Sequence, residues 1–582
     1  MWADLTRSGQ LPTLRNQRCI GLRLDGVTNK LAILFNKAKI IVEAQPPAKH
    51  TRSAIVAILT ASAFAFFFGL GQLGFLGPDE PRYAEVAREM FESGDYISTR
   101  LCGCLWFEKP ALVYWMSAAG YRLFGVDEFA ARAPIALAAL ATVALIYFAV
   151  RRLGSHSVAL TSALILTTSG IFIAYARVST PDMVLTAAIT ASLLTAFHSL
   201  RASGPTRSVL WAISFLFVGL AVLAKGLVGA LLVFSILGIH LILAGRLRSV
   251  RWRDWLIGLV VFLAVAASWY GPVTARHGWA FIEEFFVRHH FQRYTSNEFG
   301  HPQPFYFFFL VAMAGVAPWS FFLIPAIGRF RSLWESRDSL LGLAWIWVVV
   351  PIVFFSFSES KLPGYILPIF PALAVIIGVE VERFLSREAD GVLSKAAWLT
   401  GLLVTGMSIG FLIFVRSESV SVGGWRILLD GLPLVLAVVS LIALASKKGL
   451  AFVVSASGVV ISIILASVIL LFPTLQGEVT LKSLSLEAAE ALRPGEKIGF
   501  YLKKEFAPVF YSGGRVLCEP RRGGTFYALH QNMVADALQN ESSLILITDW
   551  KWREGLERDP RFTTELIASQ GESLALRVTL KR

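Results

Sequence analysis

Residues 54–76 read AIVAILTASAFAFFFGLGQLGFL, an apolar run without a charged side chain, and residues 77–85 continue directly with GPDEPRYAE. A helix needs about 20 apolar residues to cross a bilayer, so the run predicts a membrane span that ends at a cluster of charged groups. A second charged phrase, Trp106-Phe107-Glu108-Lys109-Pro110, follows in the same loop. Charged groups at the mouth of a membrane bundle are costly to desolvate, which makes them functional candidates.

The composition of the whole chain indicates a polytopic membrane protein. Of its 582 residues, 55% are hydrophobic and only 16% are charged, whereas an ordinary globular protein carries about 25% charged residues. Uncharged apolar stretches predict about thirteen spans. They lie near residues 54–76, 129–150, 157–174, 183–200, 209–224, 227–244, 255–272, 305–326, 340–357, 364–381, 396–415, 430–446 and 450–473.

Lysine and arginine residues predict the orientation, because short cytoplasmic loops carry the positive excess. Basic clusters occupy alternate loops, near residues 151–152, 201–207, 246–253, 329–337, 383–395 and 447–448. The opposite face, with the loop at residues 77–128 and the C-terminus, is then expected on the outer side of the membrane. The net charge of +14 follows from topology and from anionic lipid head groups, and needs no nucleic-acid partner.

The chain divides by composition into three parts. Residues 1–53 are expected to be a cytoplasmic extension without a signal-peptide layout, and the sequence leaves open whether residues 1–50 belong to the native protein. Residues 54–473 form the predicted membrane domain, with outward loops at 77–128 and 273–304 that are expected to lie at the membrane surface. Residues 474–582 alternate helix-like and strand-like segments, which predicts a small α/β domain outside the membrane.

Two acids stand at predicted helix starts on the outer side. Asp79 follows Gly77-Pro78, and Asp182 follows Thr180-Pro181. One interpretation is a helix-start role, with Asp79 as the N-cap. The other is a carboxylate that orients or deprotonates a substrate hydroxyl at a helix N-terminus. We predict that both acids are catalytic.

Four cations are predicted at the outer ends of different spans or loops. They are Lys109, Lys225, Arg293 and Lys361. A single cation at such a place is typical of a snorkelling side chain. Together, converging on one side, they would make a pocket for a phosphate leaving group.

Histidine, glutamate and cysteine side chains are candidates for metal binding or for cross-linking. His290 and Glu108 are candidate ligands of a divalent metal ion, and the alternative is hydrogen bonding to phosphate or solvent. Cys102 and Cys104 lie in the first outward loop, and Cys518 lies in the C-terminal part. A bond between Cys102 and Cys104 would close a strained ring, and we expect the cysteines to be incidental.

A series of motifs along the chain resembles the aminoarabinose lipid A transferases, which belong with the bacterial relatives of the protein O-mannosyltransferases. The motifs are Pro78-Asp79-Glu80-Pro81-Arg82-Tyr83, Phe107-Glu108-Lys109-Pro110, Arg132-Ala133-Pro134, Ser179-Thr180-Pro181-Asp182, Ala224-Lys225-Gly226, His290-Phe291-Gln292-Arg293 and Lys361-Leu362-Pro363-Gly364-Tyr365. The resemblance covers about residues 54–582, and it implies a bacterial inner-membrane protein whose active site and C-terminal α/β domain face the periplasm. It implies a GT-C membrane glycosyltransferase, inverting at the sugar, with a polyprenyl (undecaprenyl) phosphate donor.

The resemblance also implies roles for single residues. Asp79 and Asp182 would be the active-site acids, and Lys109 and Arg293 would hold the lipid phosphate. The residues lining the pocket would be Tyr83, Lys225 and Tyr365, and the metal-binding pair would be Glu108 and His290, with Arg288 where a further histidine is expected.

The remaining alternatives for the function differ in the acceptor of the sugar. The preferred one is lipid A or lipopolysaccharide, which would receive a sugar of the 4-amino-4-deoxy-L-arabinose type. A protein O-mannosyltransferase acting on secreted polypeptides shares the motifs and stays open. A lipid or solute transporter would place ionisable groups near the bilayer midplane and often shows repeated halves, whereas here they lie at the outer ends.

Overall fold

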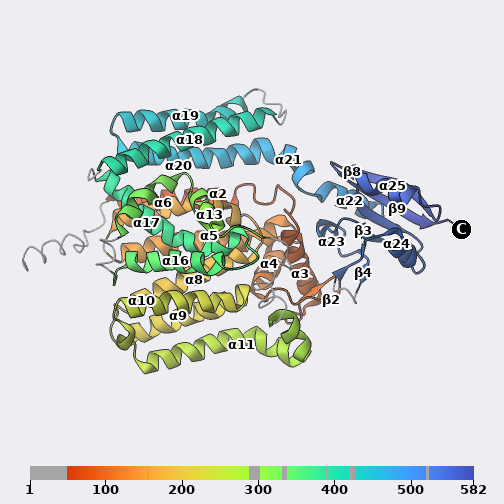
Figure 1. Ribbon diagram of the computed structural model, residues 1–582, viewed down its shortest axis with the longest axis horizontal. Helices are drawn as coiled ribbons and strands as arrows, with labels where there is room; N and C mark the ends of the chain where they lie inside the picture. The colour runs from red at the N-terminus through yellow and green to blue at the C-terminus, as the bar shows by residue number, and fades with distance from the viewer. Residues whose placement is uncertain are drawn as a thin grey trace, which may run out of the picture.

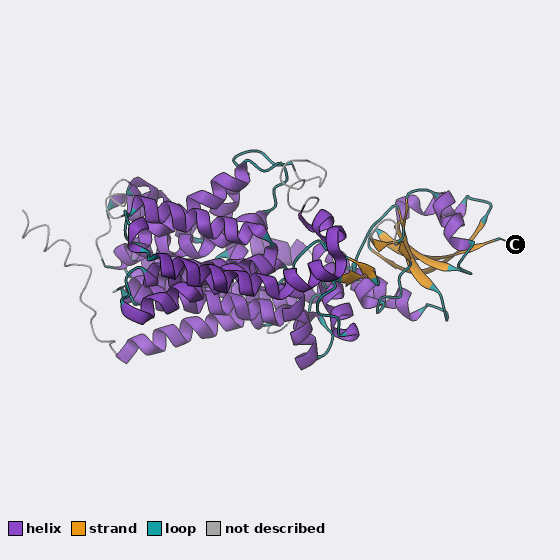
Figure 2. Cartoon of the chain, turned by 90° about the horizontal axis from the view of Figure 1, so that it is seen from below, coloured by secondary structure: helices purple, strands orange, loops and turns teal. Residues whose placement is uncertain are grey.

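The protein is a helical bundle with a small sheet at one end. The computed structural model describes residues 49–153, 155–286, 302–330, 337–386, 390–417, 424, 426–519 and 524–581. Figure 1 shows the long helices side by side, with the C-terminal sheet beyond the end of the bundle where α3 (Asp79–Ser93) and α4 (Leu112–Phe124) lie. The view from below in Figure 2 shows the same separation of a helical part from a strand-rich part.

Most predicted spans are helices of the bundle. Within the described residues, eight helices are long and apolar enough to cross a membrane. They include α5 (Glu128–Arg151), α8 (Pro181–Ser199), α9 (Gly204–Lys225), α11 (Trp252–Ile282), α17 (Phe370–Leu385), α18 (Gly391–Ser417), α19 (Arg426–Ala445) and α20 (Gly449–Ala466). The 3-10 helix η4 (Pro363–Ile369) leads into α17, and η5 (Ser467–Leu471) and α21 (Phe472–Val479) continue α20.

Two predicted spans are bent helix pairs. In the first pair, α6 (His156–Thr167) and α7 (Gly170–Ala176) meet at an angle of 64°. In the second pair, α13 (Phe307–Gly315) meets the stretch Trp319–Gly328 at an angle of 111°. That stretch contains η3 (Trp319–Phe322) and α14 (Leu323–Gly328). At the first bend the Thr168 and Ser169 hydroxyls donate to carbonyls of the preceding turn, and such back-bonding bends helices. At the second bend Pro318 has no N–H to continue a helix.

Three apolar helices are too short to meet the same criterion for a span. They are α2 (Lys49–Phe67), α10 (Leu227–Leu243) and α16 (Leu340–Ser356). The apolar part of α2 begins at Arg52. The polytopic helical architecture is confirmed, while the expected count of about thirteen spans stays a prediction.

Ion pairs gather several basic loops at one end of the bundle. Asp338, just before α16, accepts ion pairs from Arg246 at 2.5 Å and from Arg201 at 3.4 Å. Arg207 pairs with Asp254 at 3.4 Å in the same region. The loops that follow α8 and α10 therefore meet at the end of the bundle away from the sheet (Figure 1).

The first outward loop is a compact unit. The short strands β1 (Arg100–Leu101) and β2 (Cys104–Leu105) form a hairpin between α3 and α4. α11 extends past its predicted span, with a break at Gly278 where φ is 57°. The second outward loop continues into residues 287–301, which lie outside the described residues.

The C-terminal part contains a five-stranded mixed sheet, which confirms the predicted α/β fold. Its order is β6 (Tyr527–Ala528), β3 (Lys497–Tyr501), β7 (Leu544–Asp549), β9 (Ser573–Leu580) and β8 (Phe562–Gln570). Strand β3 runs parallel to β6 and β7, whereas β9 is antiparallel to β7 and β8. The remaining elements are α22 (Lys482–Glu490), α23 (Ala507–Tyr511), β4 (Cys518–Glu519), β5 (Gly524–Thr525), α24 (Gln531–Leu538) and α25 (Trp550–Glu557).

Specific contacts fix this domain against the bundle. The Tyr511 hydroxyl donates to Glu128 at 2.7 Å and accepts from the Phe75 backbone N–H at 3.0 Å. Lys482 pairs with the same Glu128 carboxylate at 2.7 Å. The Phe510 ring packs edge-on against Phe75, with 4.8 Å between centroids. The domain thus rests on the end of the bundle that carries the predicted site.

Candidate active site

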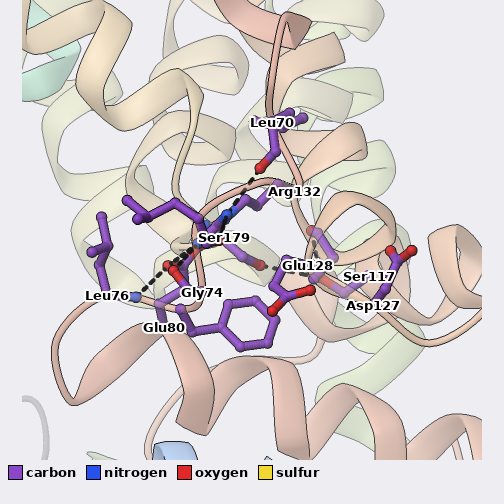
Figure 3. A network of polar contacts seen from close by, with 12 residues as sticks. Leu70, Gly74, Leu76, Glu80, Ser117, Asp127, Glu128, Arg132 and Ser179 are labelled. Carbon is purple, nitrogen blue, oxygen red and sulfur yellow. Dashed lines mark hydrogen bonds and ion pairs between the residues drawn. The ribbon is translucent and has the colours of Figure 1, made fainter. Parts of the chain in front are cut away.

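A buried ion pair organises the start of α3. Glu80 and Arg132 of α5 form a two-bond pair, with Nε donating to Oε1 at 2.7 Å and Nη2 donating to Oε2 at 2.8 Å (Figure 3). Glu80 also accepts from the backbone N–H groups of Leu76 and Ser179, both at 2.8 Å. The remaining N–H groups of Arg132 donate to the backbone carbonyls of Leu70, Leu73 and Gly74.

This network brings the two predicted acids to one place. Asp79 is the first residue of α3, and Asp182 lies in the first turn of α8, close after the Ser179 amide that Glu80 holds. The N-cap interpretation of Asp79 is wrong, because Pro78 occupies that position and no side chain makes a capping bond. Both carboxylates therefore lie at helix N-termini, where negative charge is stabilised, without being consumed as caps.

A chain of alternating charges begins at Asp79. Arg82 donates to Asp79 at 2.5 Å and pairs with Glu108 at 3.1 Å, and Lys109 donates to Glu108 at 2.9 Å. The Asp79 side chain is 48% exposed, whereas the Glu108 side chain is only 6% exposed. Asp79 is thus the carboxylate of this chain that a substrate can reach.

Aromatic rings surround the Arg82 guanidinium. It lies 5.4 Å from the ring centroid of Tyr83, 5.6 Å from Trp106 and 5.2 Å from Phe506 of the C-terminal domain. Burial by itself would lower the pKa of Arg82, but the neighbouring Glu108 carboxylate raises it above its usual value. Arg82 therefore stays charged and holds Asp79 in place.

A second cluster forms around Asp182. Lys225, the last residue of α9, donates to Asp182 Oδ1 at 2.5 Å, and its ammonium lies 4.9 Å from the ring centroid of Tyr365. Gly364 packs so closely that a Cβ built on it would lie 2.9 Å from Asp182 Oδ1 and 2.7 Å from the Tyr175 hydroxyl. The structure thus joins three of the predicted residues, Asp182, Lys225 and Tyr365.

The two clusters are neighbours. Asp79 and Asp182 both act electrostatically on the Tyr175 phenol of α7. Phe107, two residues before Lys109, belongs to the same apolar cluster as Leu223, two residues before Lys225. The backbone segments just before the two lysines therefore belong to one packed region.

The other predicted residues differ in how they relate to these clusters. Tyr83 is buried, with its ring 6.2 Å from Tyr114, and burial raises its pKa above the usual value. Lys361 is buried and donates to the Ser358 carbonyl at 2.6 Å. Arg293 and His290 lie outside the described residues, so their roles stay predictions.

The described residues do not present a ready set of metal ligands. Within the described ranges, no group of three or more His, Cys, Asp or Glu side chains is placed to hold a metal ion. The Glu108 carboxylate is flanked by the Arg82 and Lys109 cations, which repel a divalent ion. The metal-binding role of Glu108 with His290 stays a prediction, and we derive no chemical step from it.

Several residues of this site were not predicted from the sequence. Glu80 and Arg132 stand in the quoted motifs, but only their shared burial shows that they form a pair. Tyr175 had no sequence signal beyond being a tyrosine inside an apolar run. Phe506 and Lys504 come from the C-terminal domain, and burial together with the Arg82 cation lowers the pKa of Lys504. A contact between domains leaves no spacing pattern that could have identified it.

Gly364→Ala should lower the transfer rate by about a hundredfold, because the new Cβ must displace Asp182 or Tyr175, and small misplacements at a reacting centre are costly. The rate is to be measured with purified, folded protein. Gly170→Ala is the matched control, since a Cβ there meets nothing within 4 Å. An unchanged rate for Gly364→Ala would show that the close packing of Gly364 against Asp182 and Tyr175 is not needed for transfer.

Comparisons with known proteins were made with the sequence and with the fold. Residues 108–270 match the family described as dolichyl-phosphate-mannose-protein mannosyltransferase. A protein from Pseudomonas paraeruginosa named "Undecaprenyl phosphate-alpha-4-amino-4-deoxy-L-arabinose arabinosyl transferase" is 30% identical over 361 residues, which are 60% of this chain and 63% of that protein. A relative of the same name from Aeromonas salmonicida is 30% identical over 357 residues, 59% of this chain and 64% of the relative. The matched regions thus span less than two thirds of these curated relatives.

The fold is shared more widely than the sequence. The crystal structure of ArnT from Cupriavidus metallidurans bound to undecaprenyl phosphate superposes with a TM-score of 0.73 at 24% identity, covering 91% of this chain and 98% of that one. This likeness confirms the predicted GT-C type of membrane fold with a small C-terminal sheet domain. The comparisons together confirm the resemblance predicted from the motifs.

Proposed function

We propose that this chain is a membrane glycosyltransferase that moves a sugar of the 4-amino-4-deoxy-L-arabinose type from undecaprenyl phosphate to lipid A or lipopolysaccharide. The names of the curated relatives support the donor and the sugar. One observation about this chain carries the proposal. A half-exposed carboxylate, Asp79, is held by Arg82 in a charge chain that ends at Lys109, and the pair of Asp182 with Lys225 lies at the same end of the bundle.

The proposed orientation places this end of the bundle in the periplasm of a bacterial inner membrane. The basic loops joined by Asp338 lie at the opposite end, which would then be cytoplasmic. A donor lipid would remain in the bilayer, and its phosphate would meet the cations at the outer surface. The acceptor would approach from the periplasmic side.

The proposed reaction is a direct displacement at the anomeric carbon. An acceptor oxygen forms a bond to that carbon, and the bond from carbon to the donor phosphate oxygen breaks. The electron pair leaves on undecaprenyl phosphate, whose charge Lys109 and Arg293 would stabilise. If the acceptor is a lipid A phosphate, it is already anionic, and Asp79 positions it or the sugar amine. If the acceptor is a hydroxyl, Asp79 takes its proton.

Lys109→Ala should weaken the use of the donor lipid about tenfold to a hundredfold, because a lost charge-assisted hydrogen bond costs roughly 1.5–3 kcal/mol. The measurement is a titration of donor lipid at fixed acceptor. Lys551→Ala is a matched control, since Lys551 is exposed on α25 of the C-terminal domain. Unchanged donor dependence in Lys109→Ala would show that the phosphate is held elsewhere.

A second candidate function is protein O-mannosyltransferase-like transfer to secreted polypeptides. The family match over residues 108–270 favours it, because the described family uses dolichyl-phosphate-mannose. Mass spectrometry of lipid A, glycans and secreted proteins from a deletion strain distinguishes the two. Loss of an aminopentose from lipid A supports our proposal, and loss of hexose from secreted proteins supports the alternative. A transporter would instead show uptake without any covalent product.

A further inference from the structure

The turn of the outward hairpin carries a cysteine in an unusual backbone conformation. Leu101 pairs with Cys104, so Cys102 and Gly103 form a two-residue turn with φ of 54° and 73°. A turn with two positive φ angles favours asparagine, aspartate or glycine. The Gly103 N–H donates to Glu89 of α3 at 2.9 Å, which fixes the turn against the bundle. Turn chemistry therefore gives no reason for a cysteine at position 102.

The C-terminal domain presents a second cysteine to this turn. Cys518 opens β4 and pairs with Thr525 of β5. The interaction between the two thiols raises the pKa of Cys102 and lowers the pKa of Cys518, so the two side chains lie close together although more than 400 residues separate them in the sequence. Both side chains are partly buried and neither is bridged in this structure.

Close contacts between the C-terminal domain and the bundle keep the two thiols near each other. A Cβ built on Gly524, the first residue of β5, would lie 3.7 Å from the ring of Trp106, the residue that follows β2. A Cβ on Gly514 would lie 2.9 Å from Arg88 of α3. These close approaches, together with the Tyr511 contacts, leave the domain little freedom to move the thiols apart.

We propose that Cys102 and Cys518 form a disulfide that fastens the C-terminal domain to the outward hairpin. The proposal goes beyond transfer activity and revises the expectation that the cysteines are incidental. It rests on the periplasmic orientation proposed above, since disulfides persist in oxidising compartments. Because Trp106, Glu108 and Lys109 follow the hairpin directly, the bridge would also fix the segment that carries the predicted phosphate ligand.

The chemistry is an exchange with a protein disulfide of that compartment. The Cys518 thiolate attacks one sulfur of the donor disulfide, and the donor's other sulfur leaves as a thiolate. The Cys102 thiol, deprotonated, then attacks Cys518 in the mixed disulfide and releases the second donor thiolate. Two cysteines are oxidised by two electrons, the donor is reduced to its dithiol, and two protons pass to the donor. A hydrogen bond from Cys102 lowers the pKa of Cys518, which favours the attacking thiolate.

The test is a non-reducing peptide map of the full chain, isolated from membranes after its thiols have been blocked with N-ethylmaleimide. Trypsin should release residues 101–122, with N-ethylmaleimide on Cys104, and residues 516–521 as one linked species, two hydrogens lighter than the sum of these two peptides. Most Cys518 should be in this species. It should vanish in Cys102→Ser and persist in Cys104→Ser, the matched control two residues away. Alkylated Cys518, or a linkage that survives Cys102→Ser, would overturn the proposal.

Labelling of intact cells with a membrane-impermeant maleimide separates failure of the bridge from failure of the orientation. We expect no labelling of Cys518 until an impermeant reductant is added, and labelling afterwards. Labelling without reductant would show that the cysteines face outward but are free, which refutes the bridge and leaves the proposed function intact. No labelling under either condition, with Cys518 modified only after cell lysis, would refute both the bridge and the proposed orientation.

Discussion

Asp79→Asn should abolish detectable sugar transfer while the protein stays folded, with an expected loss of about a hundredfold to ten-thousandfold, the range for removal of a general acid or base. The amide keeps the size of the side chain and can still accept a hydrogen bond from Arg82, but it cannot take a proton or carry charge. Asp79 makes no capping bond, so the helix start does not depend on its carboxylate. The measurement is the transfer rate of purified protein whose elution and thermal unfolding match those of the wild type.

Asp127→Asn is the matched control for Asp79→Asn. Asp127 is an aspartate at the start of α5 whose side chain accepts from the Ala130 N–H, and asparagine serves equally well as such a cap. Its transfer rate should stay at the wild-type level. Wild-type turnover in well-folded Asp79→Asn would remove Asp79 from the catalytic site.

Glu80→Gln, in contrast to Asp79→Asn, should destabilise the folded protein. The change leaves the Arg132 guanidinium buried without its counter-charge, and breaking a buried pair costs about 3–5 kcal/mol. The amide also cannot accept from Arg132, Leu76 and Ser179 with both of its polar atoms. We expect a low yield of purified protein and a clearly lowered unfolding temperature in detergent. The unfolding temperature is measured by heating samples and then following, by fluorescence, how much protein still elutes from a size-exclusion column.

Glu92→Gln is the matched control on the same helix. Glu92 is half exposed and pairs with Arg88, and exposed pairs contribute about 0–1 kcal/mol. Its unfolding temperature should change little. If Glu80→Gln were as stable as wild type, the network in Figure 3 would not be what positions the two acids.

The sequence predicted the architecture where the physical signal is local. Apolar runs identified most bundle helices, because length and hydropathy suffice for a helix that crosses lipid. The bends inside two predicted spans were missed, since hydropathy does not distinguish a straight helix from a bent pair. Strand β8 has little sequence signal, because as an edge strand it has few buried side chains and little alternation.

The sequence predicted the acids and cations of the site, but not the contacts that hold them in place. The motifs identified Asp182, Lys225 and Tyr365, and the structure places them together. Asp79 was interpreted as an N-cap or a catalytic acid, and its neighbour Glu80 proves to be the buried carboxylate that organises the site. Spacing along one helix cannot show which of two adjacent acids turns inward when the partner lies more than fifty residues away. The same reason hid the contribution of Phe506, which depends on how the C-terminal domain docks.

The most direct test of the proposed function is transfer by the purified, reconstituted protein. The protein is incubated with undecaprenyl phosphate carrying 4-amino-4-deoxy-L-arabinose and with lipid A, and both lipids are analysed by mass spectrometry. We predict lipid A that has gained one aminopentose, an equal amount of released undecaprenyl phosphate, and neither product with Asp79→Asn. Unmodified lipid A with an intact donor, from wild-type protein that is folded and active on a secreted polypeptide with a polyprenyl-phosphate mannose donor, would contradict the proposal.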